Sequence, residues 1–307
     1  MEHYSFLIDE EYDGIRLDKA ITSLSELDLT RSYIQKLIKS DAVKVNDKKA
    51  KAGLSLKVGD RIEFDVPDAA PIDILPEDIP LDILYEDDSV IVINKPKGMV
   101  VHPANGHYTN TMVNALMYHC KDSLSGINGI LRPGIVHRID MDTTGSIIAC
   151  KNDASHNNIA DQLKSHSLNR TYRAICHGRI SEDEMTIDIN IGRSKNDRKK
   201  MAVVSPDEGK CAITHVKVLE RFNDFTYIEC RLETGRTHQI RVHMASVGHP
   251  LAGDNVYSTR KCPFKTEGQC LHAYKLGFIH PVSGEYVETV APLPEYFEKI
   301  LSVLRAK

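Results

Sequence analysis

An acidic segment that contains several prolines interrupts the chain between residues 65 and 90, and it constrains the fold more than any other feature. It carries nine acidic residues, no basic residue, and the four prolines Pro67, Pro71, Pro76 and Pro80. Proline lacks a backbone N–H and disfavours helix at the residue before it, so no long helix or central strand can run through this segment. We therefore predict an extended linker over residues 67–80. A first domain then covers residues 14–66 and a second covers residues 81–307.

Charge follows the same division. The 307 residues carry 39 basic and 43 acidic groups, a formal net charge of −4. Taken alone, that total argues against a nucleic-acid partner. Counted by region, however, residues 1–13 carry −5, residues 14–64 carry +4, residues 65–90 carry −9 and residues 91–307 carry +6. Two basic blocks are therefore available to a polyanion, while the net total describes solubility.

The first residues predict no signal peptide, because they include acids and lack a basic segment followed by an apolar core. The longest aliphatic run is Val90–Ile93, far shorter than the roughly 20 residues that span a bilayer. The seven cysteines form no Cys-x-x-Cys pair. Reduced thiols in a cytoplasmic protein without a membrane partner fit this pattern.

The first basic block predicts a helix over residues 30–40, capped by Thr30, followed by a strand from Val43 and a strand over residues 61–66. Its basic side chains form either a solvated surface or a phosphate-binding face. The candidate RNA-binding residues here are Arg31, Lys36, Lys39, Lys44 and Lys48.

The second block contains a loop, HRIDMDTTG, directly before a predicted strand over residues 146–150. Loops held by rigid elements often carry function. Asp140 could serve as nucleophile, general base or metal ligand, or it could simply cap the loop and pair with an arginine. Lys95 and Lys97 follow an earlier predicted strand, where either phosphate binding or a plain turn would explain them.

A later motif, LETGRTHQIRVH, places polar residues at the start of a predicted helix capped by Thr237. A helix N-terminus binds anions readily. Arg241 lies beside the apolar face of this helix, so we expect it to have an acidic partner.

No cofactor or metal is expected. The sequence has no dinucleotide fingerprint, P-loop or His-Glu-x-x-His motif. Cys262, Cys270, His272 and His280 do not have the spacing of a standard zinc site.

Three motifs together resemble those of the RluA family of pseudouridine synthases: HRIDMDTTG, the Arg170-Thr171-Tyr172 triplet, and LETGRTHQIRVH. In the first block, TRSYIQKLIKSDAVKVNDKKAKAG resembles the S4-type RNA-binding domain. The resemblance implies an α+β fold with a mixed, mostly antiparallel sheet and a cleft along its middle. It also implies isomerisation of uridine to pseudouridine in RNA, without a cofactor. The D-type subgroup, which modifies 23S ribosomal RNA, is the most similar.

The resemblance also implies roles for single residues. Asp140 falls on the catalytic aspartate, Tyr172 on the tyrosine beside the target base, and Arg241 on the arginine that pairs with the aspartate. We expect a bidentate contact between Asp140 and Arg241, and Arg138 to fill the gap that the flipped base leaves. The further predicted RNA contacts in this domain are His137, Arg236, His238 and Gln239.

Alternatives remain open at this point. The same family could act on transfer RNA, or the chain could be an inactive RNA-binding ribosome-assembly factor. A metal-dependent hydrolase that uses the His/Asp loop is a third possibility, and it predicts sensitivity to chelators. For the main interpretation we expect a monomer.

Overall fold

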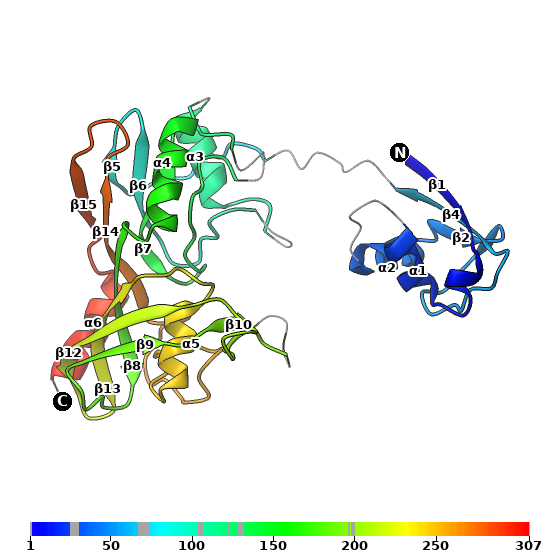
Figure 1. Cartoon of the computed structure of the whole chain (residues 1–307). Helices are drawn as coiled ribbons and strands as arrows, with labels where there is room; N and C mark the ends of the chain where they lie inside the picture. The colour runs from blue at the N-terminus through cyan, green and yellow to red at the C-terminus, as the bar shows by residue number, and fades with distance from the viewer. Residues whose placement is uncertain are drawn as a thin grey trace. The chain divides into compact units, whose positions relative to one another are not determined.

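A computed structural model describes residues 2–24, 31–66, 74–103, 107–121, 123–127, 132–195, 197 and 200–306. The chain divides into two compact units, Met1–Ile72 and Asp73–Lys307 (Figure 1). No helix within the described residues is both long enough and apolar enough to cross a membrane.

The N-terminal unit is an antiparallel sheet with the strand order β1-β4-β2-β3, packed against two helices. Its elements are β1 (Glu2–Leu7), α1 (Leu17–Leu24), α2 (Arg31–Lys39), β2 (Val43–Val45), β3 (Lys48–Lys49) and β4 (Arg61–Val66), with a short 3-10 turn over Glu10–Tyr12. The helix predicted over residues 30–40 is α2, and its Ile34, Leu37 and Ile38 face the core as expected. Thr30, the predicted cap, lies outside the described residues.

Strand β1 lies before residue 14, where the sequence places the start of this domain. It pairs with β4 along its whole length. Tyr4 and Phe6 alternate with polar residues and stack against Phe64, with ring centroids 5.4 and 6.0 Å away. Stacking of these aromatic side chains on Phe64 stabilises the acidic N-terminal segment as a strand of the sheet.

The second unit is built on one large sheet with the strand order β5-β6-β7-β14-β8-β13-β12-β9, and β15 pairs with β14. Its strands are β5 (Ile83–Glu86), β6 (Val90–Lys95), β7 (Thr144–Cys150), β8 (Asn169–His177), β9 (Glu184–Asp188), β12 (Ile213–Arg221), β13 (Phe225–Leu232), β14 (Leu271–Ile279) and β15 (Tyr286–Val290). A separate hairpin consists of β10 (Ile191–Arg193) and β11 (Met201–Val203). The helices are α3 (Met112–Cys120), α4 (Asp153–Lys164), α5 (Gln239–Ser246) and α6 (Glu295–Arg305).

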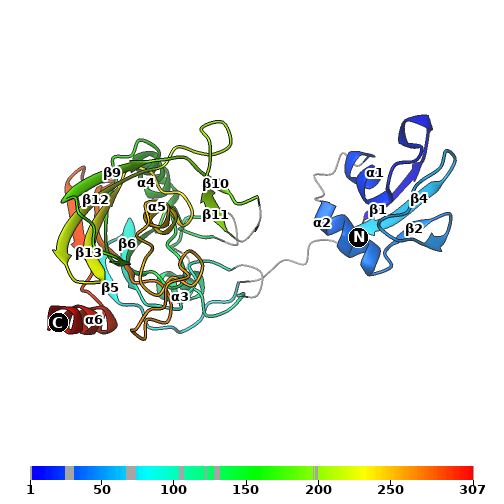
Figure 2. The same ribbon diagram turned by 90° about the horizontal axis from the view of Figure 1, so that it is seen from below.

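The predicted α+β class with a mixed, mostly antiparallel sheet is confirmed, since β7 and β14 are the one parallel neighbour pair among the described strands of this sheet. At that pair, Gly145 has a φ of +105°, and an added Cβ would come within 2.2 Å of the Ala273 carbonyl oxygen. A residue without a side chain lets β14 approach β7 directly after the HRIDMDTTG loop. Helix α5 lies beside the β10–β11 hairpin, as Figure 2 shows.

Residues 74–80, which we predicted as part of a linker, pack on the second unit. Ile74 is buried in the core of that unit. The Asn114 side chain of α3 donates to the Leu75 carbonyl at 2.8 Å, and the Glu77 N–H donates to the Asn114 carbonyl at 3.0 Å. Prolines exclude regular structure here, but the aliphatic residues between them still find apolar neighbours. Residues 67–73 lie outside the described residues.

Candidate active site

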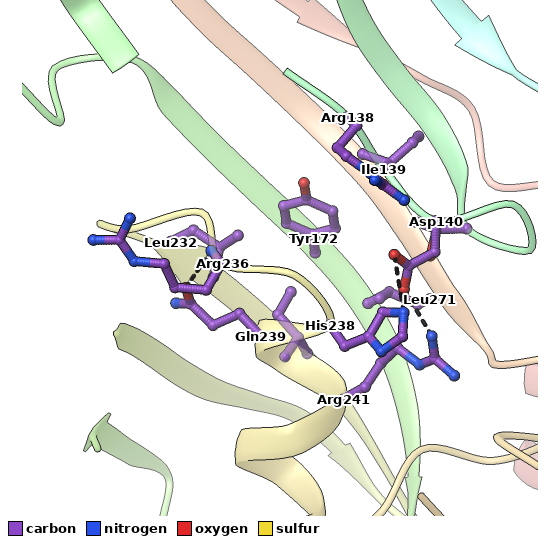
Figure 3. Close-up of a pocket in the computed structure, with 12 residues that line it drawn as sticks. Arg138, Ile139, Asp140, Tyr172, Leu232, Arg236, His238, Gln239, Arg241 and Leu271 are labelled. Atoms are coloured by element: carbon purple, nitrogen blue, oxygen red, sulfur yellow. Dashed lines mark hydrogen bonds and ion pairs between the residues drawn. The ribbon is translucent and has the colours of Figure 1, made fainter. Parts of the chain in front are cut away.

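A hollow in the second unit brings together the three motifs that lie far apart in the sequence (Figure 3). Its cavity volume is about 50 Å³, below the roughly 300–1,000 Å³ of typical small-molecule pockets. The lining residues come from the loop before β7, from β8 and β13, from the start of α5, and from β14. They are Arg138, Ile139, Asp140, Thr143, Tyr172, Leu232, Arg236, His238, Gln239, Ile240, Arg241 and Leu271.

Asp140 is held in a tight loop at the edge of this hollow. The Thr143 N–H donates to the Asp140 carbonyl at 3.0 Å and closes a turn. The neighbouring Met141 carbonyl accepts a hydrogen bond from the Lys95 ammonium at 2.9 Å. The Asp140 side chain is 18% exposed, so its carboxylate is mostly shielded yet still reachable from the hollow.

Arg241 contacts Asp140, but with a geometry that differs from our expectation. One nitrogen, Nη1, donates to Asp140 Oδ2 at 2.9 Å. The fork made by Nε and Nη2 instead grips Asp254, at 2.7 and 2.9 Å. The predicted pairing is therefore present, and the prediction that it is bidentate is wrong, because a second carboxylate takes the fork.

Asp254 is the main residue of the site that sequence reasoning missed. Its side chain is fully buried, and its Oδ1 also accepts the N–H groups of Val256 and Tyr257. Burial would raise the pKa of Asp254, but the Arg241 guanidinium and these N–H groups hold it below its usual value. The sequence feature that could have indicated Asp254 is the Gly-Asp-Asn-Val-Tyr stretch, in which an acidic residue precedes a turn.

Tyr172 lies on β8 directly opposite Cys230 of β13. It is 7% exposed, and its ring faces the same hollow as the Asp140 carboxylate (Figure 3). Burial raises the pKa of Tyr172, so the hydroxyl stays protonated at neutral pH. The aromatic face is placed where a planar ring could lie against it.

The predicted RNA contacts around the hollow separate into two groups. Arg138 is exposed on the rim, and half-buried Arg236 anchors its Nε to the Cys211 carbonyl at 2.9 Å. His238 lies beside Asp140, with Nε2 at 3.7 Å from Oδ1. These three side chains can still reach a ligand.

The other two, Gln239 and His137, already have hydrogen-bond partners inside the protein. Gln239 is buried, and its amide uses all of its hydrogen-bonding positions inside the protein: Oε1 accepts from Thr234 and Arg236, and Nε2 donates to Ile213 and Thr214. His137 accepts the Ile148 N–H on Nε2 at 3.1 Å, and burial lowers its pKa to about 3. Both side chains therefore have partners within the fold, and their predicted contact with RNA stays a prediction.

The predicted cap of α5 shifts by one residue. Helix α5 begins after His238, a residue with a φ of +57° and no capping side-chain bond, so Thr237 does not cap it. Helix α4 is capped by Asn152, whose side chain accepts the Ser155 N–H.

Lys95 and Lys97 are structural rather than phosphate-binding. Lys95 is fully buried, and its ammonium donates to the carbonyls of Pro96, Met99 and Met141 at 2.8 to 2.9 Å. Burial lowers the pKa of Lys95 to about 7. Lys97 donates to the Thr266 carbonyl and lies 3.9 Å from the centroid of the Tyr296 ring.

In the N-terminal unit, Lys39, Lys44 and Lys48 are exposed, as a role in binding requires. The side chain of Lys36 lies outside the described residues. Arg31 donates from Nε and Nη2 to Asp18 at 3.0 and 2.8 Å, and Arg16 binds the same buried carboxylate. Burial would raise the pKa of Asp18, but Arg16, Gln35 and Arg31 hold it well below its usual range.

Within the described ranges, no cluster of three or more His, Cys, Asp or Glu side chains is arranged to hold a metal ion. His272 bonds to Thr144 and to the Ala291 carbonyl, while His280 pairs with Asp87 at 2.7 Å. These two histidines therefore serve separate parts of the fold.

Comparison with known proteins agrees with this geometry. The profile of the RNA pseudouridylate synthase family matches residues 89–246, and that of the S4 domain matches residues 15–62. A Bacillus subtilis protein named uncharacterized RNA pseudouridine synthase YlyB is 51% identical, with 99% of each chain covered. A Zymomonas mobilis protein named ribosomal large subunit pseudouridine synthase D is 45% identical over 97% of this chain and 96% of its own.

Solved structures show the same fold. Human RNA pseudouridylate synthase domain containing 4 superposes with a TM-score of 0.57 at 25% identity, covering 73% of this chain and 92% of that one. Human RNA pseudouridylate synthase domain containing 1 has the same TM-score at 23% identity and covers 78% of this chain. By its family profile, its relatives over the full length and its fold, the chain belongs to the RluA-type family of RNA pseudouridine synthases and carries an S4 domain at its N-terminus.

Proposed function

We propose that this chain converts uridines of large-subunit ribosomal RNA into pseudouridine, acting as a cytoplasmic monomer without a cofactor. The observation that carries the proposal is the Asp140 carboxylate, fixed by Arg241 at 2.9 Å on the edge of a hollow whose other side is the Tyr172 ring. Relatives named ribosomal large subunit pseudouridine synthase D, at 45% identity over nearly the whole chain, support the choice of RNA.

The reaction breaks the bond from ribose to uracil, turns the base and rejoins it to the sugar through carbon five. Cleavage builds positive charge on the sugar, and an ionised carboxylate can stabilise that charge, attack the anomeric carbon or remove a nearby proton. Each of these roles needs Asp140 charged and aimed. Arg241 fixes one oxygen of this carboxylate through a charge-assisted hydrogen bond of 2.9 Å.

The target uridine must leave its stack before it can reach Asp140, at a cost of a few kcal/mol. Stacking of a base on an aromatic ring returns about 1–3 kcal/mol. Tyr172 offers such a face, and exposed Arg138 on the rim is a planar cation that can take the place of the flipped base in the RNA.

The test is pseudouridine mapping after purified protein has been incubated with unmodified large-subunit ribosomal RNA and, separately, with unmodified transfer RNA. We expect new pseudouridines at defined positions in the ribosomal RNA, and none with Asp140→Asn. Product in transfer RNA alone would reassign the substrate. No product in either RNA would contradict the proposed function, and activity of the Asn variant would contradict the role of Asp140.

A further inference from the structure

The two oxygens of Asp140 are held differently. Oδ2 accepts a hydrogen bond from Arg241 at 2.9 Å, whereas Oδ1 faces Nε2 of His238 at 3.7 Å. Figure 3 shows both side chains approaching the carboxylate from the start of α5. The contact with His238 is too long for a full hydrogen bond, so this oxygen is guided by a neighbour and remains available to a substrate.

The other nitrogen of His238 explains which way its proton points. Nδ1 lies 2.7 Å from the Tyr257 hydroxyl, and that oxygen accepts the backbone N–H of Met201 at 2.9 Å. An N–H can only donate, so the hydroxyl proton is free to be donated to Nδ1. The neutral imidazole then carries its own proton on Nε2, directed at Asp140 Oδ1. The opposite tautomer would place a lone pair against a carboxylate oxygen.

The backbone conformation of His238 also supports a positioning role for its side chain. Its φ of +57° lies in the left-handed region, which residues other than glycine seldom adopt. At this cap position a side chain often binds the first turn of the helix, but His238 makes no such bond. Its ring reaches Tyr257 and Asp140 instead, and strained backbone of this kind collects at functional sites.

Tyr257 contacts three residues of this cluster: Arg241, Asp254 and His238. Its ring lies 5.1 Å from the guanidinium carbon of Arg241, its N–H donates to Asp254 Oδ1 at 3.1 Å, and its hydroxyl binds His238. Burial raises the pKa of Tyr257, so the hydroxyl keeps its proton across the neutral range. One side chain therefore connects the arginine that holds Oδ2 to the histidine that faces Oδ1.

We propose that Tyr257 and His238 are positioning residues for the isomerisation: the Tyr257 hydroxyl fixes the His238 ring so that an Nε2–H group guides the second oxygen of Asp140. Neither residue exchanges a proton with the substrate in this arrangement. Arg241 and His238 together set the plane of the Asp140 carboxylate. Tyr257 contacts both of these side chains and holds them in position relative to each other. The inference rests on the proposed function, since it assigns these residues to that reaction.

Tyr257→Phe isolates the hydroxyl, because the ring over Arg241 and the backbone N–H to Asp254 both remain. We expect kcat on a large-subunit RNA fragment to fall about tenfold, the effect of one lost bond in a buried polar network. The Kd for the RNA should stay at the wild-type value, and the melting temperature should fall slightly because the Met201 N–H also loses its acceptor. Tyr286→Phe is the matched control, since its hydroxyl bonds to Asn169 and Glu288 on the surface of β15.

His238→Asn is the second variant, chosen because asparagine tolerates a left-handed backbone better than most residues. We expect a similar loss in kcat. We also expect the double variant to be no slower than His238→Asn alone, because both changes break the same chain of contacts from Tyr257 through His238 to Asp140, which we call the relay. Should Tyr257→Phe fail to fold, His238→Asn still carries the test through its kcat and its Kd. Losses that multiply in the double variant would show two independent roles and overturn the relay.

The pH profile gives a readout that a purely structural role would not move. His238 faces Asp140, Asp254, Arg241, Arg138 and the Tyr257 hydroxyl, and burial is the main reason that its pKa lies below the ordinary value. A hydroxyl that donates to Nδ1 favours the neutral ring. Without it the ring protonates more easily, and an imidazolium would pair with Oδ1 of Asp140 and withdraw that oxygen from the substrate. The acid limb of kcat should therefore move to higher pH in Tyr257→Phe.

The outcomes separate the two proposals. Wild-type protein that forms no pseudouridine in any RNA would contradict the proposed function itself. Active wild-type protein whose kcat and acid limb are unchanged in both Tyr257→Phe and His238→Asn would overturn only the relay. Loss of RNA binding or of folding in His238→Asn, with kcat per folded molecule unchanged, would also overturn it.

Discussion

Each unit of this molecule contains a fully buried aspartate that organises arginine, and the two do so to opposite effect. In the N-terminal unit, Asp18 binds Arg16 at 3.1 Å and Arg31 at 2.8 Å, and these arginine side chains remain 51% and 47% exposed. In the catalytic unit, Asp254 binds Arg241, which is only 6% exposed and passes its remaining nitrogen to Asp140. Asp18 therefore holds two arginines that face solvent, whereas Asp254 holds one arginine that faces a second carboxylate, that of Asp140.

The difference follows from what each unit must bind. Two cations on one buried anion give a net positive cluster at the surface, which suits phosphate and is sensitive to salt. Two anions on one buried cation give a net negative cluster, which suits a developing positive charge on a sugar. On the proposed function, the same residue types form a binding surface in one unit and a reactive carboxylate in the other, because their proportions and burial differ.

The largest test of this comparison is Asp140→Asn. The amide keeps the shape of the side chain and removes the charge on which each proposed role depends. We expect product formation to fall by at least about a thousandfold, with the Kd for RNA within about threefold of wild type. Single-turnover assays and filter binding on the same RNA fragment measure the two quantities. Comparable losses in both would place Asp140 in the binding surface and remove the contrast between the units.

Asp254→Asn comes next, because it breaks the buried pair while leaving Asp140 intact. Removing one partner of a buried ion pair costs about 3–5 kcal/mol, and the freed guanidinium is then aimed less well at Asp140. We expect kcat to fall about a hundredfold and thermal unfolding to begin at lower temperature. Asp224→Asn, a change of the same chemistry on the turn before β13 and away from the hollow, is the control. Wild-type kcat in Asp254→Asn would show that Arg241 needs no anchor.

Much of this contrast could be predicted from the sequence. Periodicity placed α2 and β4, because local patterns carry these features, and the resemblance of three short motifs to a known family selected Asp140, Tyr172 and Arg241. The fork between Arg241 and Asp254 could not be predicted, since thirteen residues and a turn separate the two and only the folded turn brings them together. For the same reason the sequence leaves both phosphate binding and a plain turn open for Lys95, whereas its ammonium turns inward to three carbonyls.

Lys95→Met tests whether that buried ammonium supports the reactive loop. Methionine fills a similar volume but leaves three buried carbonyl oxygens without a donor, for which we expect a loss of about 2–3 kcal/mol in the free energy of unfolding.

Because burial lowers the pKa of Lys95 to about 7 from its ordinary 10.5, the folded protein binds fewer protons than the unfolded chain between those values. This group should therefore make wild-type stability rise with pH across that window, and the Met variant should lose that slope. Denaturant unfolding at several pH values between 7 and 10 measures both effects. Equal slopes in the two proteins would show that Lys95 does not titrate there.

The smallest expected effect, and the one that separates charge from geometry, is that of Asp18→Asn. The change makes the N-terminal unit more positive by one charge, so charge counting alone predicts tighter RNA binding. If Asp18 acts by orienting Arg16 and Arg31, the amide releases both guanidinium groups, and we expect binding to weaken about fivefold. The pKa of Asp18 is depressed in the folded protein, so its contribution to stability is complete above pH 4 and is lost as the pH falls further. Protection of residues 2–24 and 31–66 against hydrogen exchange should therefore fall below pH 4 in the wild type, and less steeply in Asp18→Asn. Tighter binding by the Asn variant would mean that net charge, rather than a fixed arrangement of arginines, governs this surface.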